Sequence, residues 1–104
     1  MNERYYSMLG LAQRAGKIAS GSFRVEQEIT SGHARLVILS EDIGQAIEKK
    51  ITACCRSRNV RFVKTGSREA LSHAVGKEDR SCLAVTDDGF AAALLKLLSP
   101  DSAQ

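Results

Sequence analysis

The chain has 104 residues, of which 43% are hydrophobic and 26% are charged, values typical of a globular domain that exclude wholesale disorder. This length favours a single domain and leaves little room for separate regulatory modules. The net charge of +3 permits an anionic partner without requiring one. Arginine outnumbers lysine nine to six, and because the guanidinium group fits phosphate in a bidentate way, the composition slightly favours such a partner.

Helical and strand-like segments alternate along the chain. Apolar residues recur with helical spacing at Tyr5, Met8, Leu9 and Ala12, whereas residues 34–40 form an apolar run typical of a buried central strand. In chain order we predict a helix over 3–15, a short extended piece over 17–20, a helix over 22–31, a strand over 34–40, a helix over 40–58, a strand over 60–65, a helix over 67–75, a strand over 82–87 and a helix over 88–98. This order indicates an α/β layered sandwich with helices on both faces of the sheet.

Local signals mark the starts of several predicted helices. Ser22 and Ser67 are each expected to cap the helix that follows. Asp42, with Gln45 three residues later, matches a capping box. Asp87 lies where the last helix begins, a position at which the helix dipole favours an acidic side chain.

One domain is expected over residues 1–98, followed by a flexible tail over 99–104 that holds the only proline. No apolar stretch approaches the ~18 residues that a bilayer span requires. The N-terminal residues lack the apolar core of a signal peptide. We therefore expect a cytoplasmic protein without a membrane partner.

Catalysis and metal binding find little support in the sequence. Cys54, Cys55 and Cys82 are odd in number and include no Cys-x-x-Cys, so we expect reduced cysteines that act as small core residues. His33 and His73 have no serine nucleophile elbow nearby, and neither histidines nor cysteines show the spacing of metal ligands. We predict no catalytic residue, no metal and no cofactor, and a hydrolase or redox enzyme is the weakest hypothesis.

The remaining signal lies in three loop segments, which an α/β sandwich can bring together at one end of its strands. Residues 19–24 and 65–70 each begin a helix whose free N–H groups can meet an anion, and residues 75–81 form a glycine-led basic loop. Such a surface suits phosphate and splayed RNA bases better than a DNA groove, so no DNA partner is expected. The alternative is that these are ordinary solvated charges around helix starts. The candidate cations are Lys17, Arg24, Arg68, Lys77 and Arg80.

Phe23 directly follows the predicted cap at Ser22, and two roles are open for it. Its ring either packs into the core as part of a hydrophobic staple or stays exposed as a platform on which a base stacks.

The order of four stretches resembles the kink-turn RNA-binding ribosomal-protein superfamily of the L7Ae and L30e type, most of all its small bacterial YlxQ-type members. The stretches are GLAQRAGKIASG, SGHARLVILSEDI, GSREALSHAVGK and CLAVTDDGFAAALLK, and the resemblance covers residues 5–96. It implies a three-layer α/β/α sandwich around a mixed sheet of about four strands, with a strand at residues 17–20. It also implies RNA binding through the three loop segments named above.

The start of the second helix departs from the pattern of that superfamily. Typical members read Gly-x-Asn-Glu-x-x-Lys there, and the Asn and Glu contact sheared G·A pairs while the Lys contacts phosphate. Here Gly21 matches, whereas Phe23, Arg24 and Gln27 occupy the Asn, Glu and Lys positions. Because arginine only donates hydrogen bonds, Arg24 cannot copy the Glu contacts but can pair with phosphate or guanine O6 and N7.

The later segment keeps more of the pattern, since Arg68 supplies its basic residue and Gly76 its last glycine. Our leading hypothesis is an RNA-binding protein of this fold, with structured RNA as partner and ribosomal RNA, kink-turn-like RNA or the ribosome as candidates. The alternative is a protein–protein interaction or regulatory module on the same fold that has lost kink-turn specificity. The candidate RNA-binding residues are Lys17, Gly21, Ser22, Phe23, Arg24, Gln27, Arg68, Gly76, Lys77 and Arg80.

Overall fold

The computed structural model describes residues 3–98, in which five helices alternate with four strands. The predicted kinds and order of elements are confirmed, and the predicted tail at residues 99–104 lies outside the described residues. The elements are α1 (Glu3–Arg14), β1 (Ile18–Ser20), α2 (Ser22–Thr30), β2 (Leu36–Leu39), α3 (Gln45–Ser57), β3 (Phe62–Lys64), α4 (Arg68–Ala74), β4 (Cys82–Val85) and α5 (Asp88–Leu98).

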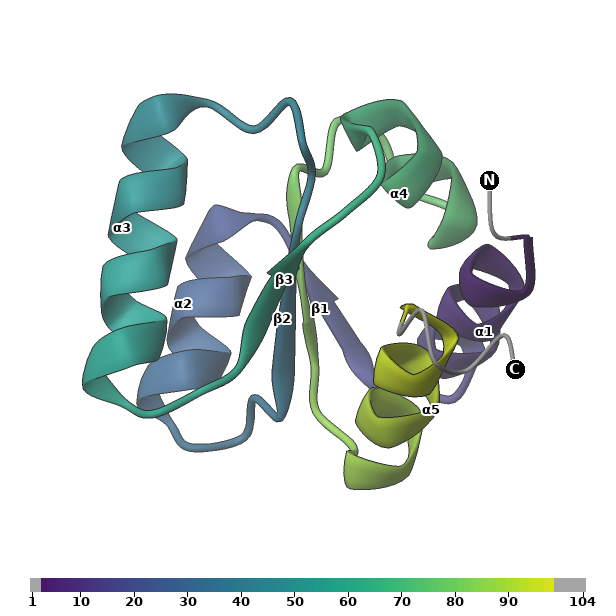
Figure 1. Cartoon of the computed structure of the whole chain (residues 1–104), viewed down its shortest axis with the longest axis horizontal. Coiled ribbons are helices and arrows are strands. Elements are labelled where there is room, and N and C mark those ends of the chain that lie inside the picture. The colour runs from purple at the N-terminus through teal and green to yellow at the C-terminus, as the bar shows by residue number, and fades with distance from the viewer. Residues whose placement is uncertain (1–2, 99–104) are drawn as a thin grey trace.

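The four strands form one mixed sheet in the order β1-β4-β2-β3. Strand β4 pairs antiparallel with both β1 and β2, with Val85 opposite Ile18 on one side and Leu36 on the other. Strand β3 pairs parallel with β2. Helices α2 and α3 cover one face of the sheet, and α1, α4 and α5 cover the other (Figure 1). The three-layer α/β/α sandwich expected from the sequence is confirmed.

Each face of the sheet carries its own apolar core. Along β2, Leu36 and Ile38 pack toward α1, α4 and α5, whereas Val37 and Leu39 pack toward α2 and α3, as the two-residue period of a strand requires. Both faces are covered, so the strand reads as an unbroken apolar run. Cys55 and Cys82 are fully buried on the α2/α3 side, as expected of small core residues.

Two of the predicted helix starts are wrong. Ser22 is the first residue of α2 rather than its cap; the cap is Gly21, which offers no side-chain hydrogen bond. Asp42 does not cap α3, because α3 begins only at Gln45 and its cap is Gly44. Residues 40–44 are therefore a loop, and Asp42 is free to contact a different element. The predicted cap at Ser67 is confirmed, since its hydroxyl oxygen accepts a hydrogen bond from the N–H of Ala70 at 3.0 Å.

Candidate nucleic-acid interface

The ends of β1, β2 and β3 and the start of β4 meet at one edge of the sheet, at the top of Figure 1. We call this the loop edge and define it as residues 20–24, 40–44, 66–69 and 76–81. Backbone hydrogen bonds join its segments: Gly21 N–H donates to the carbonyl of Cys82 at 3.1 Å, and Glu41 N–H donates to the carbonyl of Gly66 at 2.7 Å. The three segments singled out in the sequence thus share one edge, together with a fourth, residues 40–44, that the sequence did not mark.

The start of α2 exposes both backbone donors and an aromatic ring. Gly21 adopts a φ of 92°, a left-handed conformation that favours glycine, and contributes no side chain to the first turn. Among residues 3–98, the N–H groups of Ser22, Phe23 and Arg24 have no hydrogen-bond partner. Phe23 is 74% exposed, so its reading as a core residue is wrong. Arg24 is exposed beside it and forms no ion pair with the described residues.

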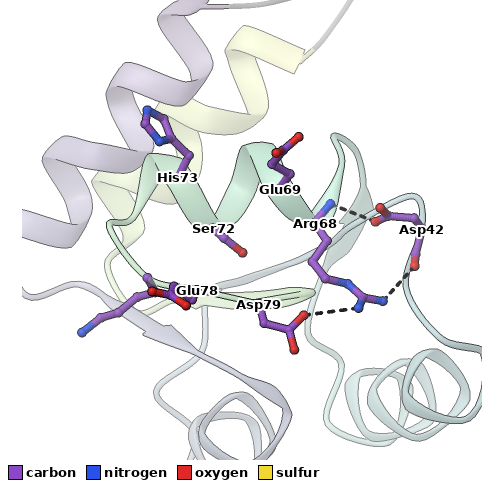
Figure 2. Close-up of a pocket in the computed structure, with 8 residues that line it drawn as sticks. Asp42, Arg68, Glu69, Ser72, His73, Glu78 and Asp79 are labelled. Atoms are coloured by element: carbon purple, nitrogen blue, oxygen red, sulfur yellow. Dashed lines mark hydrogen bonds and ion pairs between the residues drawn. The ribbon is translucent and has the colours of Figure 1, made fainter.

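Arg68 points between two acidic residues of neighbouring loops (Figure 2). Its guanidinium group donates to Asp79 Oδ1 at 3.3 Å and to the carbonyl oxygen of Asp42 at 3.2 Å. Its backbone N–H donates to Asp42 Oδ1 at 2.8 Å, and this hydrogen bond is the main reason why the pKa of Asp42 is lowered. Arg68 therefore joins the start of α4 to both adjoining loops, and it would have to release Asp79 to meet a ligand with its whole guanidinium group.

Arg80 is also engaged within the protein. Its Nε donates to the hydroxyl of Ser20 at 3.1 Å, and its backbone N–H donates to the hydroxyl of Ser72 at 2.7 Å. These bonds connect the loop before β4 to the end of β1 and to α4. By contrast, Lys77 is exposed and forms no ion pair with any residue between 3 and 98. Gly76 turns the chain ahead of it with a φ of 67°.

Lys17 lies away from the loop edge. Its carbonyl accepts a hydrogen bond from Thr86 N–H at 2.9 Å, which places its backbone beside the end of β4, at the opposite edge of the sheet. Gln27 lies exposed in the second turn of α2. Of the predicted cations, the structure thus brings Arg24, Arg68, Lys77 and Arg80 to one edge and leaves Lys17 at the other.

The loop edge is not a basic surface. Its four segments contain the cations Arg24, Arg68, Lys77 and Arg80 against the carboxylates of Glu41, Asp42, Glu69, Glu78 and Asp79. A cavity of about 520 Å³ lies between α4 and these loops, and most of its charged lining is acidic. Within residues 3–98, Arg24 and Lys77 have neither an ion pair nor a side-chain hydrogen bond, whereas Arg80 donates to the neutral oxygens of Ser20 and Glu78 and also keeps its charge unpaired. An anion would therefore be held near these groups and the N-terminus of α2.

The described residues contain no group of three or more His, Cys, Asp or Glu side chains arranged to hold a metal ion. Burial raises the pKa of the Cys55 and Cys82 thiols to about 11, and both side chains lie in the core on the α2/α3 side of the sheet. None of the helices within residues 3–98 is long and apolar enough to cross a bilayer.

The architecture and this edge define a class of small α/β/α sandwich proteins that offer helix starts and loops at one end of a mixed sheet. Residues 3–95 match the Ribosomal protein L7Ae/L30e/S12e/Gadd45 family, and the chain belongs to this family, as the resemblance in its sequence predicted. The family is not one of enzymes, in agreement with the expected lack of catalysis.

Individual relatives agree with this assignment. The chain is 44% identical to the RNA-binding protein YlxQ of Bacillus subtilis (strain 168) over 94 residues, which cover 90% of this chain and 94% of the relative. The YlxQ protein of Enterococcus faecium, also named as RNA-binding, is 26% identical over 89 residues, covering 86% of this chain and 85% of the relative.

Solved structures show the same fold. A protein with unknown function from Bacillus halodurans C superposes with a TM-score of 0.88 at 35% identity, covering 94% of this chain and 98% of the other. The 15.5kD RNA binding protein of Giardia lamblia superposes with a TM-score of 0.76 over 94% of this chain and 88% of the other; at 20% identity it supports the fold alone.

Proposed function

We propose that this protein binds structured RNA through the loop edge, without catalysis and in the cytoplasm. The observation that carries the proposal is the start of α2, where an exposed aromatic ring, an unpaired arginine and three free N–H groups lie together. Base stacking on an aromatic ring and phosphate binding at a helix N-terminus are established ways to hold RNA. The RNA-binding relatives named above support the same function.

The contacts differ from those that the wider superfamily pattern implies. Arg24 stands where a Glu would accept hydrogen bonds from guanine, and a guanidinium group can only donate. We infer that Arg24 pairs with phosphate or with guanine O6 and N7, that Phe23 stacks on an unpaired base, and that Lys77 contacts phosphate from the neighbouring loop. Arg68 and Arg80 hold the loops in position through their bonds to Asp79, Asp42 and Ser20.

A gel-shift panel of kink-turn RNA, other structured RNA including ribosomal RNA fragments, and single strands tests the proposal. We expect salt-sensitive binding to at least one structured RNA. Arg24→Glu should weaken that binding about tenfold or more, because a hydrogen bond to a charged group contributes ~1.5–3 kcal/mol. Lys96→Glu is the control, since Lys96 is an exposed cation on α5, which covers the opposite face of the sheet from α2. Equal losses in the two variants would show only general charge attraction, and no binding by the unaltered protein would overturn the proposal.

A protein partner is the second candidate, and the acidic balance of the loop edge favours it. The loop edge carries five carboxylates and four cations, so its side chains have a net negative charge. At longer distances this charge repels a polyanion such as RNA. Co-purification of one stable protein partner that resists nuclease, together with no binding in the RNA panel, would support this candidate over the first.

A further inference from the structure

A second hollow lies at the opposite edge of the sheet from the loop edge, where α2 and α3 end. It has a volume of about 420 Å³ and is formed by the turns that lead from α2 into β2 and from α3 into β3. Three arginines from these two turns line it, and we call it the arginine pocket. Its charged lining residues are Arg35, Arg58 and Arg61, and the rest of its lining is uncharged: Ile29, Gly32, Ala34, Asn59 and Val60.

The ordinary explanation for arginine at a helix end is that it satisfies the last carbonyl groups, but here the backbone does so. At the end of α2, the N–H of Gly32 donates to the backbone carbonyl of Ile29, and the N–H of His33 donates to the backbone carbonyl of Glu28. At the end of α3, Asn59 N–H donates to Arg56 and Val60 N–H donates to Cys55. Both are the paired hydrogen bonds of a Schellman motif. Neither helix end therefore needs Arg58 or Arg61 as a cap.

The three arginines differ in how they are engaged. Arg35 is held on both sides, because it donates to the carbonyl of Gly32 at 3.0 Å and pairs with Asp88 at 3.2 Å. Arg58 and Arg61 are exposed and form no hydrogen bond through their side chains and no ion pair with any residue between 3 and 98. Two guanidinium groups at the rim of one concave surface are thus left unneutralised.

The charge of this end of the molecule is opposite to that of the loop edge. The turns at residues 15–17, 31–35 and 58–61 and the start of α5 carry Lys17, Arg35, Arg58 and Arg61 against Asp87 and Asp88. The C-terminal ends of α2 and α3 offset part of this excess, at about half a negative charge each. A positive balance remains, whereas at the loop edge the carboxylates outnumber the cations.

We propose that the arginine pocket binds a phosphate group of an RNA backbone and is a second RNA contact, separate from the loop edge. Guanidinium groups bind phosphate in a bidentate way, which Arg58 and Arg61 are free to do. No aromatic ring lines the pocket, and the nearby Phe62 ring is covered by Arg56 at 5.4 Å, so the pocket offers no platform for a base. It therefore reads the backbone and not the sequence. The choice of RNA as the partner rests on the function proposed above.

A double variant with a matched control tests this inference. Arg58→Glu with Arg61→Glu removes the two unpaired cations, and Lys49→Glu with Lys96→Glu makes the same change in net charge at exposed sites on α3 and α5. Against a structured RNA bound by the unaltered protein, we expect the arginine variant to lose about tenfold more affinity than the control. Its plot of log affinity against log salt should also flatten by about one to two units, because one or two phosphate contacts are lost.

Amide NMR during an RNA titration separates the two surfaces. Gly32 and Asn59 report on the arginine pocket, and Gly21 and Gly76 report on the loop edge. Shifts at Gly32 and Asn59 that the arginine variant abolishes would support this inference, even if the loop edge were silent and the proposed loop-edge site were therefore wrong.

Two outcomes would overturn the inference. In the first, Gly32 and Asn59 do not shift and the arginine variant binds as well as its control, while the loop edge shifts normally; the proposed function would then stand alone. In the second, the unaltered protein binds no RNA, which would overturn both proposals. Thermal unfolding of each variant verifies that it is folded, as expected for exposed positions.

Discussion

Gly66 is the residue of the loop edge at which the backbone leaves least room for change. Its φ is +78°, and a β-carbon there would lie 2.6 Å from the hydroxyl oxygen of Tyr6. The Tyr6 ring forms a T-shaped pair with the buried Tyr5 ring, with centroids 5.4 Å apart, so a shift of Tyr6 alters that contact. We expect Gly66→Ala to lower the free energy of unfolding by ~1–2 kcal/mol for the left-handed backbone and by a further ~1–3 kcal/mol for the overlap.

Gly16→Ala is the matched control for that prediction. Gly16 has nearly the same φ, +75°, but nothing lies within 4 Å of the added carbon, so only the backbone cost applies. Denaturant unfolding of the two variants measures the difference. An equal loss in both would show that Tyr6 accommodates the methyl group and that the close approach has no energetic consequence.

Phe23 is the residue at which stability and function separate most clearly. Because its ring is 74% exposed, Phe23→Ala should leave the free energy of unfolding within about 0.5 kcal/mol. If the ring stacks on a base, the same change should lower RNA affinity by ~1–3 kcal/mol, roughly 5- to 150-fold. Thermal unfolding and RNA titration of one preparation measure both quantities. A large loss of stability with unaltered affinity would mean that the ring packs against the protein.

At the scale of single elements, the two serines predicted as helix caps provide a comparison. Ser67 accepts the hydrogen bond from Ala70 at the start of α4, whereas Ser22 makes no cap bond at the start of α2. We expect Ser67→Ala to destabilise the protein by about 0.5–2 kcal/mol and Ser22→Ala to have an effect within about 0.5 kcal/mol. Denaturant midpoints of the two variants measure this, and a larger loss from Ser22→Ala would contradict the assignment of Gly21 as the cap.

Features that depend on neighbouring residues could be predicted from the sequence, whereas side-chain contacts between distant segments could not. The apolar run of β2 and the cap at Ser67 depend on neighbouring residues only, and both are confirmed. The capping box at Asp42 was wrong because that carboxylate instead accepts a hydrogen bond from Arg68, 26 residues later. A local pattern cannot distinguish a cap from such a contact.

The candidate site shows the same limit. The family resemblance and the glycines correctly predicted that three segments meet at the loop edge. They did not predict that some cations of these segments are hydrogen-bonded within the protein. Arg80 contacts Ser20, 60 residues earlier, and Arg68 contacts Asp79, so two of the predicted ligand contacts are occupied within the protein. Lys17 is close to Gly21 in sequence, yet strand β1 lies between them and carries Lys17 to the other edge. Because Lys17 and Gly21 are close in sequence, we predicted that they share one surface. The three residues of β1 are enough to place them at opposite edges of the sheet.

At the scale of the whole molecule, buried ionisable groups lie in both apolar cores, one on each face of the sheet. Cys55 and Cys82 are in the core beneath α2 and α3, and burial raises the pKa of each thiol to about 11 from an ordinary value of 9.0. Tyr5 is in the core beneath α1 and α5, and burial, assisted by the neighbouring Tyr6, raises its pKa as well. Deprotonation of any of these groups is thus less favourable in the folded protein than in the unfolded chain.

These shifts predict a loss of global stability at alkaline pH. Between about pH 9 and pH 11 the unfolded chain releases the two thiol protons while the folded protein retains them, so the free energy of the unfolded state falls relative to that of the folded state. The stabilisation is fully present below pH 9 and is lost as the pH rises through 11, by on the order of 1–3 kcal/mol for each thiol. Denaturant unfolding at about pH 8 and about pH 10.5 measures the change.

Cys55→Ala with Cys82→Ala should reduce the pH dependence, even though lost packing lowers stability at every pH. An unchanged pH dependence in the double variant would assign the alkaline loss to other groups, with Tyr5 the next to test.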